Sequence, residues 1–478
     1  MEPINAPASI DLISLAPVLV LSVFAMGVLV LDLFAGKNKA LVVFVSITGL
    51  FLSGVSALAK YKLPVYSFND SYVVDPLSVF FIFIFTLSSA LAILLSIEYN
   101  RREGIRVGEY YSLILFCTIG MILLASSTDL IMIFLGIEIV SICLYILAGI
   151  RRGDLKSNES ALKYFLLGAF ATGFLLYGMA LIYGTTGTTN LLKIASVIQE
   201  ETVSSMPILL LGVVLLVVGF GFKVSSAPFH MWTPDVYQGA PTPVTAFMAV
   251  GPKAAALAAL FRVFTQSLPE LDSTWETLLI VVAVFTMIIG NLGAIVQSNV
   301  KRLLAYSSIS HVGYILMAVI AKNSIATASL LFYMLAYAFM IFGVFGIIVI
   351  MGREGEENLE IENYAGLGYK HPLLALSMTV FLLSLGGLPP FAGFVAKFYI
   401  FSAALKEGLV ALVVIAVLNS AVSFYYYLKI IVYMYMKEPV QETRVSLSPI
   451  TLFVVAVSVI ATIELGIFPD PIIALAQN

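Results

Sequence analysis

The chain has 478 residues, of which 60% are hydrophobic and only 11% are charged. Soluble globular proteins carry roughly a quarter charged residues, so this composition excludes a water-soluble enzyme and a disordered scaffold. The formal net charge of -3 is too small to indicate a nucleic-acid partner. We therefore expect an all-α polytopic membrane protein, which has the lipid bilayer as its surroundings and no nucleic acid as a partner.

Apolar runs long enough to cross a bilayer, which takes about 20 residues each, follow one another along the chain. Each run is continuous, whereas the strands of a transmembrane β-barrel would alternate between apolar and polar residues. The runs therefore predict helices. They lie at residues 13–34, 39–59, 77–97, 109–127, 129–149, 160–184, 207–222, 243–264, 277–297, 303–321, 325–351, 372–404, 408–436 and 449–468, about 14 transmembrane helices in all.

Proline interrupts the chain at two of these runs. Pro228 follows the run at 207–222, and Pro389 and Pro390 divide the run at 372–404. Proline removes a backbone donor, and a broken helix at membrane depth is tolerated only inside protein or beside a water-filled cavity. Two such breaks in different halves of a chain indicate a transport path built from structural repeats.

The breaks also suggest how the chain is divided. Each one lies in the fourth run of a five-run group, and an odd number of helices makes two such groups inverted relative to each other. The expected divisions are an N-terminal three-helix segment at 1–100, five-helix repeats at 109–264 and 277–436, and a C-terminal helix at 449–478.

The distribution of Lys and Arg between loops predicts the orientation, because cytoplasmic loops carry the excess. With the N-terminus placed outside, the inside loops hold most of the basic loop residues. They are Lys37, Lys39, Arg101, Arg102, Arg106, Arg151, Arg152, Lys156, Lys301, Arg302, Arg353, Lys370, Lys437 and Arg444. The outside loops hold Lys60, Lys62, Lys193, Arg262, Lys322 and Lys406. Both termini are thus expected on the non-cytoplasmic side of an inner (plasma) membrane.

Five lysines fall inside the runs, where a charge costs at least about 2.5–3.5 kcal/mol. Lys429 stands near a helix end, where its side chain can extend to the membrane interface. For Lys163, extension to the interface and a functional role are equally open. Lys253 falls near mid-depth and is interpreted as functional. Lys223 and Lys397 each stand beside one of the proline breaks.

Two further titratable residues stand within the runs. Glu138 is either a protonated carboxyl held by a hydrogen bond or the partner of one of the lysines. A Glu–Lys pair that changes its separation would act as a proton switch, because an approaching carboxylate favours the charged lysine. His311 titrates near neutrality and has serine and tyrosine neighbours, so a proton relay and a structural role are equally open.

These residues lie in motifs that resemble those of the antiporter-like subunits of proton-pumping NADH:quinone oxidoreductase, respiratory complex I. The similarity extends over the whole chain and is greatest to the subunit N family, the ND-two family of mitochondria. The motifs are DPLSVFF (75–81), GFKVSSAPFHMWTPDVYQGAPTPVTAFMAVGPKAAALAAL (221–260), KRLLAYSSISHVGYI (301–315), YAGLGYKHP (364–372) and LSLGGLPPFAGFVAKF (383–398).

The resemblance implies a proton path along the central plane of the membrane. By position in the motifs, Glu138 matches a family glutamate that pairs with the lysine at Lys223, and Lys253 matches a connecting lysine. His311 matches a histidine between two half-channels, Lys397 a terminal lysine, and Lys163 a further family lysine. The function implied is proton translocation coupled to quinone reduction elsewhere in the complex.

The same resemblance implies that other chains carry the redox groups. Cys117 and Cys143 form no ligand pattern, so no metal or cofactor site is expected here, and quinone, FMN and iron–sulfur clusters are expected in partner subunits. Expected partners are other complex I membrane subunits, with M-like and K-like neighbours. Two alternatives remain: a stand-alone or multi-subunit cation/proton antiporter, and a membrane anchor whose charges only fix helix packing.

Overall fold

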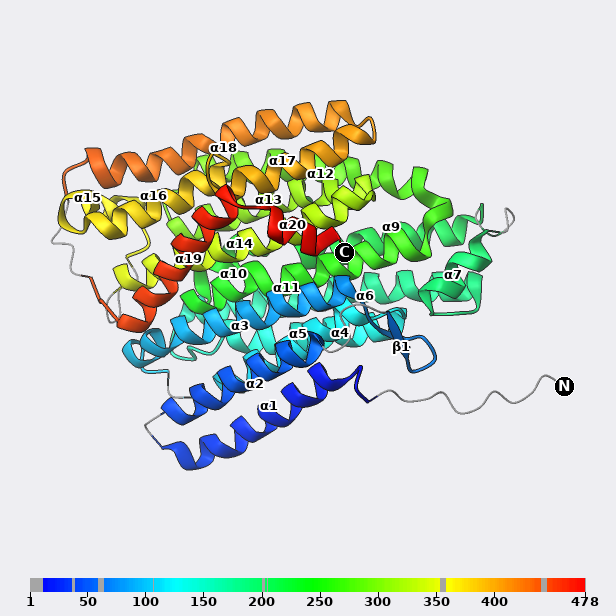
Figure 1. The fold of residues 1–478 in the computed structure, drawn as a ribbon, viewed down its shortest axis with the longest axis horizontal. Coiled ribbons are helices and arrows are strands. Elements are labelled where there is room, and N and C mark those ends of the chain that lie inside the picture. The colour runs from blue at the N-terminus through cyan, green and yellow to red at the C-terminus, as the bar shows by residue number, and fades with distance from the viewer. Residues whose placement is uncertain are drawn as a thin grey trace.

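A computed structural model describes residues 12–36, 39–58, 64–105, 107–199, 203, 205–352, 358–439 and 445–477. Its helices lie side by side, with α1 and α2 at one edge of the view and α18 at the opposite edge (Figure 1). In the described part of the chain, thirteen helices are long and apolar enough to cross a membrane. One further crossing is divided between two shorter helices, α16 and α17. The protein is thus an all-α, multi-pass membrane protein, as its composition predicted.

The N-terminal part consists of α1 (Ala16–Ala35), α2 (Ala40–Leu58) and α3 (Pro76–Arg102). Between α2 and α3 a short hairpin pairs β1 (Val65–Ser67) with β2 (Tyr72–Val74) in antiparallel register. Asp75 and Ser78 form a capping box that starts α3. α3 is largely buried, whereas α1 and α2 present most of their apolar side chains at the surface of the chain.

The middle of the chain contains the first helix break. Its elements are α4 (Glu109–Ser126), α5 (Leu130–Ala148), α6 (Leu155–Thr186), α7 (Leu191–Ile198), α9 (Pro207–Val224), α10 (Thr233–Gly239) and α11 (Thr242–Arg262). A π-helical turn, η1 (Val263–Ser267), and a 3-10 turn, η2 (Pro269–Leu271), follow α11. The short helices α7 and α10 were not anticipated, because neither is long enough to show as an apolar run.

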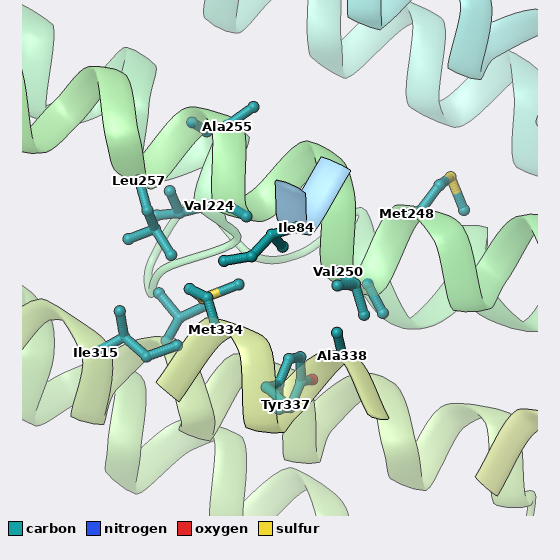
Figure 2. Close-up of a cluster of buried hydrophobic side chains, with 14 of the residues drawn as sticks. Ile84, Val224, Met248, Val250, Ala255, Leu257, Ile315, Met334, Tyr337 and Ala338 are labelled. Atoms are coloured by element: carbon teal, nitrogen blue, oxygen red, sulfur yellow. The ribbon is translucent and has the colours of Figure 1, made fainter. Parts of the chain in front are cut away.

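The last part of the chain contains the second break. Its elements are α12 (Asp272–Ile295), α13 (Val300–Ala321), α14 (Ser324–Met351), η3 (Ile361–Tyr364), α15 (Leu367–Lys370), α16 (Pro372–Gly386), α17 (Ala392–Lys406), α18 (Val410–Met436), α19 (Pro449–Ile467) and α20 (Asp470–Gln477). Helices α11, α13 and α14 are the most deeply buried spans. Figure 2 shows the apolar packing around α11 and α14, including Met248, Leu257 and Met334.

Arg262 fastens the start of α3 to the central helices. Arg262, which the loop count assigned to an outside loop, is only 1% exposed, and its Nη2 lies 2.5 Å from Asp75 Oδ1. Its Nε donates to the Ala125 carbonyl at 2.7 Å. Burial alone would raise the pKa of the Asp75 carboxyl, but the Arg262 guanidinium and the Ser78 amide hold it below its usual value. The loop assignment was wrong because Arg262 belongs to α11, which η1 continues, and its side chain is buried against Asp75 and the Ala125 carbonyl.

Candidate functional site

The first helix break places Lys223 in the last turn of α9. α9 ends at Val224, Ser225 adopts a left-handed conformation, and Pro228 lies between this end and α10. Trp232 Nε1 donates to the Phe222 carbonyl at 3.1 Å. The Ala227 amide donates to Thr286 Oγ1 at 2.9 Å. Polar backbone groups freed by the break are thus satisfied within the protein, as membrane depth requires.

The second break places Lys397 in the second turn of α17. Gly387 ends α16 in a left-handed conformation, and Pro389 and Pro390 lie before α17 begins. Lys397 is 4% exposed. Its Nζ donates to the carbonyls of Leu385 at 3.1 Å and Gly386 at 2.8 Å. A cation is favoured at a helix C-terminus, so the interruption of the helix creates the site that holds this lysine.

Lys223 contacts α5 close to Glu138 but does not form an ion pair with that residue. Lys223 Nζ donates to Ser141 Oγ at 2.8 Å, and Ser141 lies one helical turn after Glu138. Glu138 Oε1 is buried and has no hydrogen-bond partner among the described protein atoms. In this structure the lysine therefore contacts the serine next to the carboxylate that the resemblance names as its partner.

Lys253 is buried in the middle of α11, where it is 3% exposed. Its Nζ donates to Ser308 Oγ of α13 at 2.6 Å. It also lies 5.3 Å from the centre of the Tyr237 ring of α10, which is a cation–π distance. No carboxylate of the described residues forms an ion pair with it.

His311 is held on both sides of its ring by tyrosine hydroxyls from other helices. Its Nδ1 lies 2.5 Å from Tyr333 OH of α14, and its Nε2 lies 3.2 Å from Tyr427 OH of α18. The same Tyr427 hydroxyl is 2.5 Å from Ser307 Oγ. A continuous chain of groups that both donate and accept hydrogen bonds thus passes through the histidine.

Helix α13 carries side chains that contact each of the two buried lysines. Ser307, His311 and Tyr314 follow one another at helical spacings of three and four residues. The neighbouring Ser308 binds Lys253, and the Tyr314 ring centre lies 4.9 Å from Lys397 Nζ. The structure therefore brings Lys253, His311 and Lys397 together along this helix.

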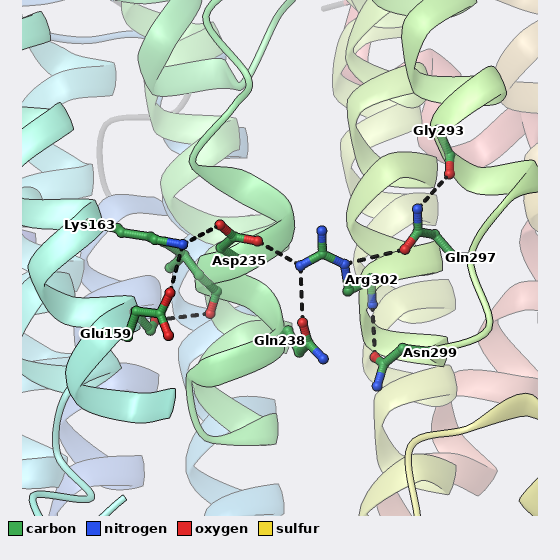
Figure 3. A network of polar contacts seen from close by, with 10 residues as sticks. Glu159, Lys163, Asp235, Gln238, Gly293, Gln297, Asn299 and Arg302 are labelled. Carbon is green, nitrogen blue, oxygen red and sulfur yellow. Dashed lines mark hydrogen bonds and ion pairs between the residues drawn. The ribbon is translucent and has the colours of Figure 1, made fainter. Parts of the chain in front are cut away.

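Lys163 lies in a different environment, a partly exposed polar network. Its side chain is 41% exposed, and Nζ lies 2.7 Å from Glu159 Oε1 and 2.6 Å from Asp235 Oδ2. The other oxygen of Asp235, Oδ1, lies 2.6 Å from Arg302 Nη1. Figure 3 shows Asp235 between the lysine and the arginine. The sequence prediction had left open whether Lys163 extends to the interface or has a functional role, and the structure places it partly exposed among carboxylates.

Three tyrosines of the site were missed from the sequence. Tyr237, Tyr333 and Tyr427 stand in apolar or mixed segments, where an aromatic residue is most often part of the core. A weak signal was present, because Tyr333 and Tyr337 are four residues apart and share one face of a helix that has no charged residue. Asp235 and Arg302 were also missed, since each could equally have been a solvated loop residue.

Comparison with known proteins identifies relatives over the full length of the chain. Residues 127–423 match the family described as NADH:quinone oxidoreductase/Mrp antiporter, TM. A protein of Trichlorobacter lovleyi named NADH-quinone oxidoreductase subunit N is 50% identical, with 98% of this chain and 97% of that protein covered. A protein of the same name from Chloroflexus aggregans is 43% identical, with 100% and 99% covered.

A solved structure gives the same fold. A chain in respiratory complex I from Thermus thermophilus with bound aureothin is 36% identical and has a TM-score of 0.81, with 97% of this chain and 100% of that chain covered. Within the described residues of the present structure, no group of three or more His, Cys, Asp or Glu side chains is placed to hold a metal ion.

Proposed function

Since the chain belongs to the subunit N family of NADH-quinone oxidoreductases, we propose that its buried lysines, glutamate and histidine form a proton path. The chain is a proton-translocating membrane subunit of that enzyme and acts with other complex I subunits. The antiporter alternative is weaker, because full-length relatives carry the subunit N name. The observation that carries the proposal is the placement of Lys253, His311 and Lys397 on or against the same helix, α13.

Lys253 and Lys397 are suited to exchange protons because their partners are not carboxylates. Lys253 donates to a serine hydroxyl, and Lys397 donates to Ser420 Oγ at 2.9 Å as well as to two carbonyls. A hydroxyl accepts a hydrogen bond from a charged ammonium and can donate one to a neutral amine. The surroundings therefore satisfy both protonation states of each lysine.

His311 provides the transfer step between the lysines. A neutral imidazole has one donor and one acceptor nitrogen, and each nitrogen contacts a tyrosine hydroxyl. When a proton arrives at one nitrogen, the other nitrogen can release one, and the hydroxyls reverse the direction of their hydrogen bonds. Tyr333 and Tyr427 thus join the residues predicted from the sequence.

Glu138 and Lys223 form the switch at the other end of the path. Ser141 and Glu138 are one turn apart on α5. A change of rotamer would therefore let Lys223 change its hydrogen-bond partner from Ser141 to Glu138. Binding to Glu138 favours the charged lysine, and moving to Ser141 lets it release its proton. Lys163, which is the most exposed of these groups, is the one nearest to water.

The remaining assignments extend this proposal to the whole subunit. Iron–sulfur clusters take several Cys ligands and this chain has two cysteines, which supports placing the clusters in partner subunits. FMN and the quinone site are proposed to lie in partner subunits as well. M-like and K-like membrane subunits are the proposed neighbours. The divisions at 1–100, 109–264, 277–436 and 449–478 are kept as proposed units, each repeat with one helix break; residues 1–11 lie outside the described part.

Both termini are proposed to lie on the non-cytoplasmic side, on the strength of the loop charges. Labelling of a C-terminal tag from each side of sealed membrane vesicles tests this, and a tag reached only from the cytoplasmic side would contradict it. Several of the basic residues that support the orientation lie outside the described residues, namely Lys37, Lys60, Lys62, Arg106, Arg353 and Arg444.

The proton path is tested by Lys253→Met in the assembled complex. We expect normal assembly and NADH oxidation that pumps on the order of tenfold fewer protons, because a positioned proton-transfer group contributes about 10²–10⁴-fold to its step. Lys429→Met is the matched control, since Lys429 is half-buried and donates only to the Gln297 carbonyl. Dye quenching in vesicles measures pumping, and NADH absorbance measures electron transfer.

Each competing function predicts a different result. A membrane anchor predicts that Lys253→Met either prevents assembly or leaves pumping unchanged in the complex that does assemble. A self-standing antiporter predicts that the reconstituted chain alone exchanges Na⁺ for H⁺ at a high rate. Either result would overturn the proposed function.

A further inference from the structure

Helix α10, the short segment that follows the first break, contacts the surroundings of both Lys223 and Lys253. Trp232, which immediately precedes it, donates to the carbonyl of Phe222, next to Lys223. Tyr237 on α10 itself lies under Lys253 with a ring-centre distance of 5.3 Å. A shift of this helix would therefore alter the environment of two lysines of the path together.

α10 is fastened on one side to α6. Lys163 Nζ of α6 lies 2.6 Å from Asp235 Oδ2, and Ser160 Oγ donates to the Val236 carbonyl at 3.1 Å. Gly239 packs so closely on α6 that an added Cβ would lie 2.3 Å from the Lys156 carbonyl oxygen. This side of α10 has no room to move without separation from α6.

The other side of α10 is fastened to α13. Arg302 Nη1 lies 2.6 Å from Asp235 Oδ1 and donates to Gln238 Oε1 at 3.0 Å. The adjacent Lys301 is fully buried and donates to the Ala240 carbonyl, at the C-terminal end of α10, at 2.7 Å. α13 is the helix that carries Ser308 and His311, so α10 is joined directly to the central part of the path.

Among the described residues of α10, Asp235 binds both neighbouring helices through charged contacts, one through each carboxylate oxygen (Figure 3). We propose that Asp235 is a positioning residue, which holds α10 between α6 and α13 and so keeps Tyr237 against Lys253. This inference rests on the proposed function, because it explains how one step of that path is aligned. Asp235 itself does not touch the buried lysines or transfer the proton.

The ion-pair network around Asp235 is partly open to water. Asp235 is 36% exposed, Lys163 41% and Arg302 26%, and a pocket lined by Lys156, Glu159 and Gln238 opens beside the carboxylate. Ion pairs with partial access to water are weaker and more easily exchanged than fully buried ones. Removal of one partner should therefore leave no fully buried, unpaired charge, and variants of the network should still assemble.

The test replaces the carboxylate by its neutral amide, Asp235→Asn, in the complete complex. We expect assembly and NADH oxidation to persist while the number of protons pumped per NADH falls at least twofold. Asp235→Glu, which keeps the charge, should restore most of the pumping. Glu159→Gln is the matched control, because it removes only the second and more exposed partner of Lys163 and should pump normally.

Arg302→Gln gives an independent measurement should Asp235→Asn assemble poorly. This substitution removes the ion pair between Asp235 and α13 but leaves the ion pair between Asp235 and Lys163. We expect the same loss of pumping per NADH. Normal pumping by both variants, or an equal loss in Glu159→Gln, would overturn the positioning role. If either of these results were found together with a pumping defect in Lys253→Met, only the positioning role would be contradicted. The proposed proton path would still be supported.

Discussion

At the scale of single residues, the partners of a titratable group decide what it can do. Lys253, His311 and Lys397 are all buried, yet each contacts hydroxyls, carbonyls or ring faces from other helices. Lys163 has two carboxylates within ion-pair distance. The buried groups therefore have the partners that the proposed proton path requires, whereas Lys163 is held by two carboxylates.

The tyrosine contacts of His311 give a prediction at this scale. Tyr427→Phe removes the hydroxyl that contacts both His311 Nε2 and Ser307 Oγ. Because the chain of exchangeable hydrogen bonds is then broken, we expect proton pumping per NADH to fall on the order of tenfold. The measurement is dye quenching in vesicles that contain the assembled variant complex.

The neighbouring residue supplies a matched control. Tyr426 is equally buried, and its hydroxyl donates to Asn291 Oδ1 at 2.9 Å and does not contact His311. Tyr426→Phe therefore loses a similar buried hydrogen bond but should retain pumping. Equal defects in the two variants would show that the loss comes from packing and not from the relay.

At the scale of elements, each broken helix serves its lysine in a different way. The end of α16 supplies free carbonyls to Lys397, whereas Lys223 reaches from the last turn of α9 to Ser141 on α5. The prolines could be recognised in the sequence as helix breaks. The direction in which each lysine points depended on how the two half-helices pack.

Gly387 gives a prediction for the second break. Its φ of +92° favours glycine, and an added Cβ would lie 3.0 Å from Lys397 Cδ. Gly387→Ala should cost roughly 1–2 kcal/mol through backbone strain and also displace Lys397 from the carbonyls. We expect a lower thermal stability together with reduced pumping per NADH.

Gly408 separates these two effects. It also has a positive φ, +74°, but no atom lies within 4 Å of an added Cβ. Gly408→Ala should therefore lower stability by a similar amount and leave pumping unchanged. If both variants pump normally, the position of Lys397 at the end of α16 does not matter for transfer.

At the scale of the whole molecule, α3 joins the N-terminal helices to both halves of the path. Arg262 at the end of α11 binds Asp75 before α3. At the other end of α3, Arg102 Nη1 donates to the carbonyls of Val349 at 2.7 Å and Gly352 at 2.8 Å, at the end of α14. α1 and α2 have no comparable charged contacts to α11 or α14 among the described residues.

The Asp75–Arg262 pair gives a prediction for the stability of this arrangement. Asp75→Asn leaves the Arg262 charge buried without its partner, which costs about 3–5 kcal/mol for fully buried pairs, and we expect the lower end because Asp75 is 19% exposed. Thermal inactivation of the purified complex should occur at a lower temperature. Asn still caps α3, so the change reports the ion pair and not the cap.

The pH dependence of this effect follows from the pKa of Asp75. A carboxyl with a lowered folded-state pKa contributes stability above its unfolded value, here 3.8, and loses it as the pH falls through the folded pKa. The difference between wild type and Asp75→Asn should therefore be constant through the neutral range. A difference that changes with pH near neutrality would mean that another group titrates with the pair.

The sequence by itself determined the class of the protein, the approximate extent of its spanning helices, the positions of both breaks and the burial of Lys253, His311 and Lys397, but not the burial of Arg262 and Lys301. These follow from hydropathy and proline content, which are local properties of the chain: the cost of placing a residue in the bilayer is set by its own side chain. The loop count failed at Arg262 for the same reason, because it assigned the residue by its neighbours in sequence.

Only the tertiary structure decided which groups meet. Tyr427 contacts His311 from 116 positions away, and Arg262 contacts Asp75 from 187 positions away. A buried tyrosine in an apolar run has the same local pattern whether its hydroxyl faces a histidine or is isolated, because the pattern records burial and not orientation. The low charge content of the sequence therefore indicated a membrane protein, whereas helix packing set the order of the groups along α13.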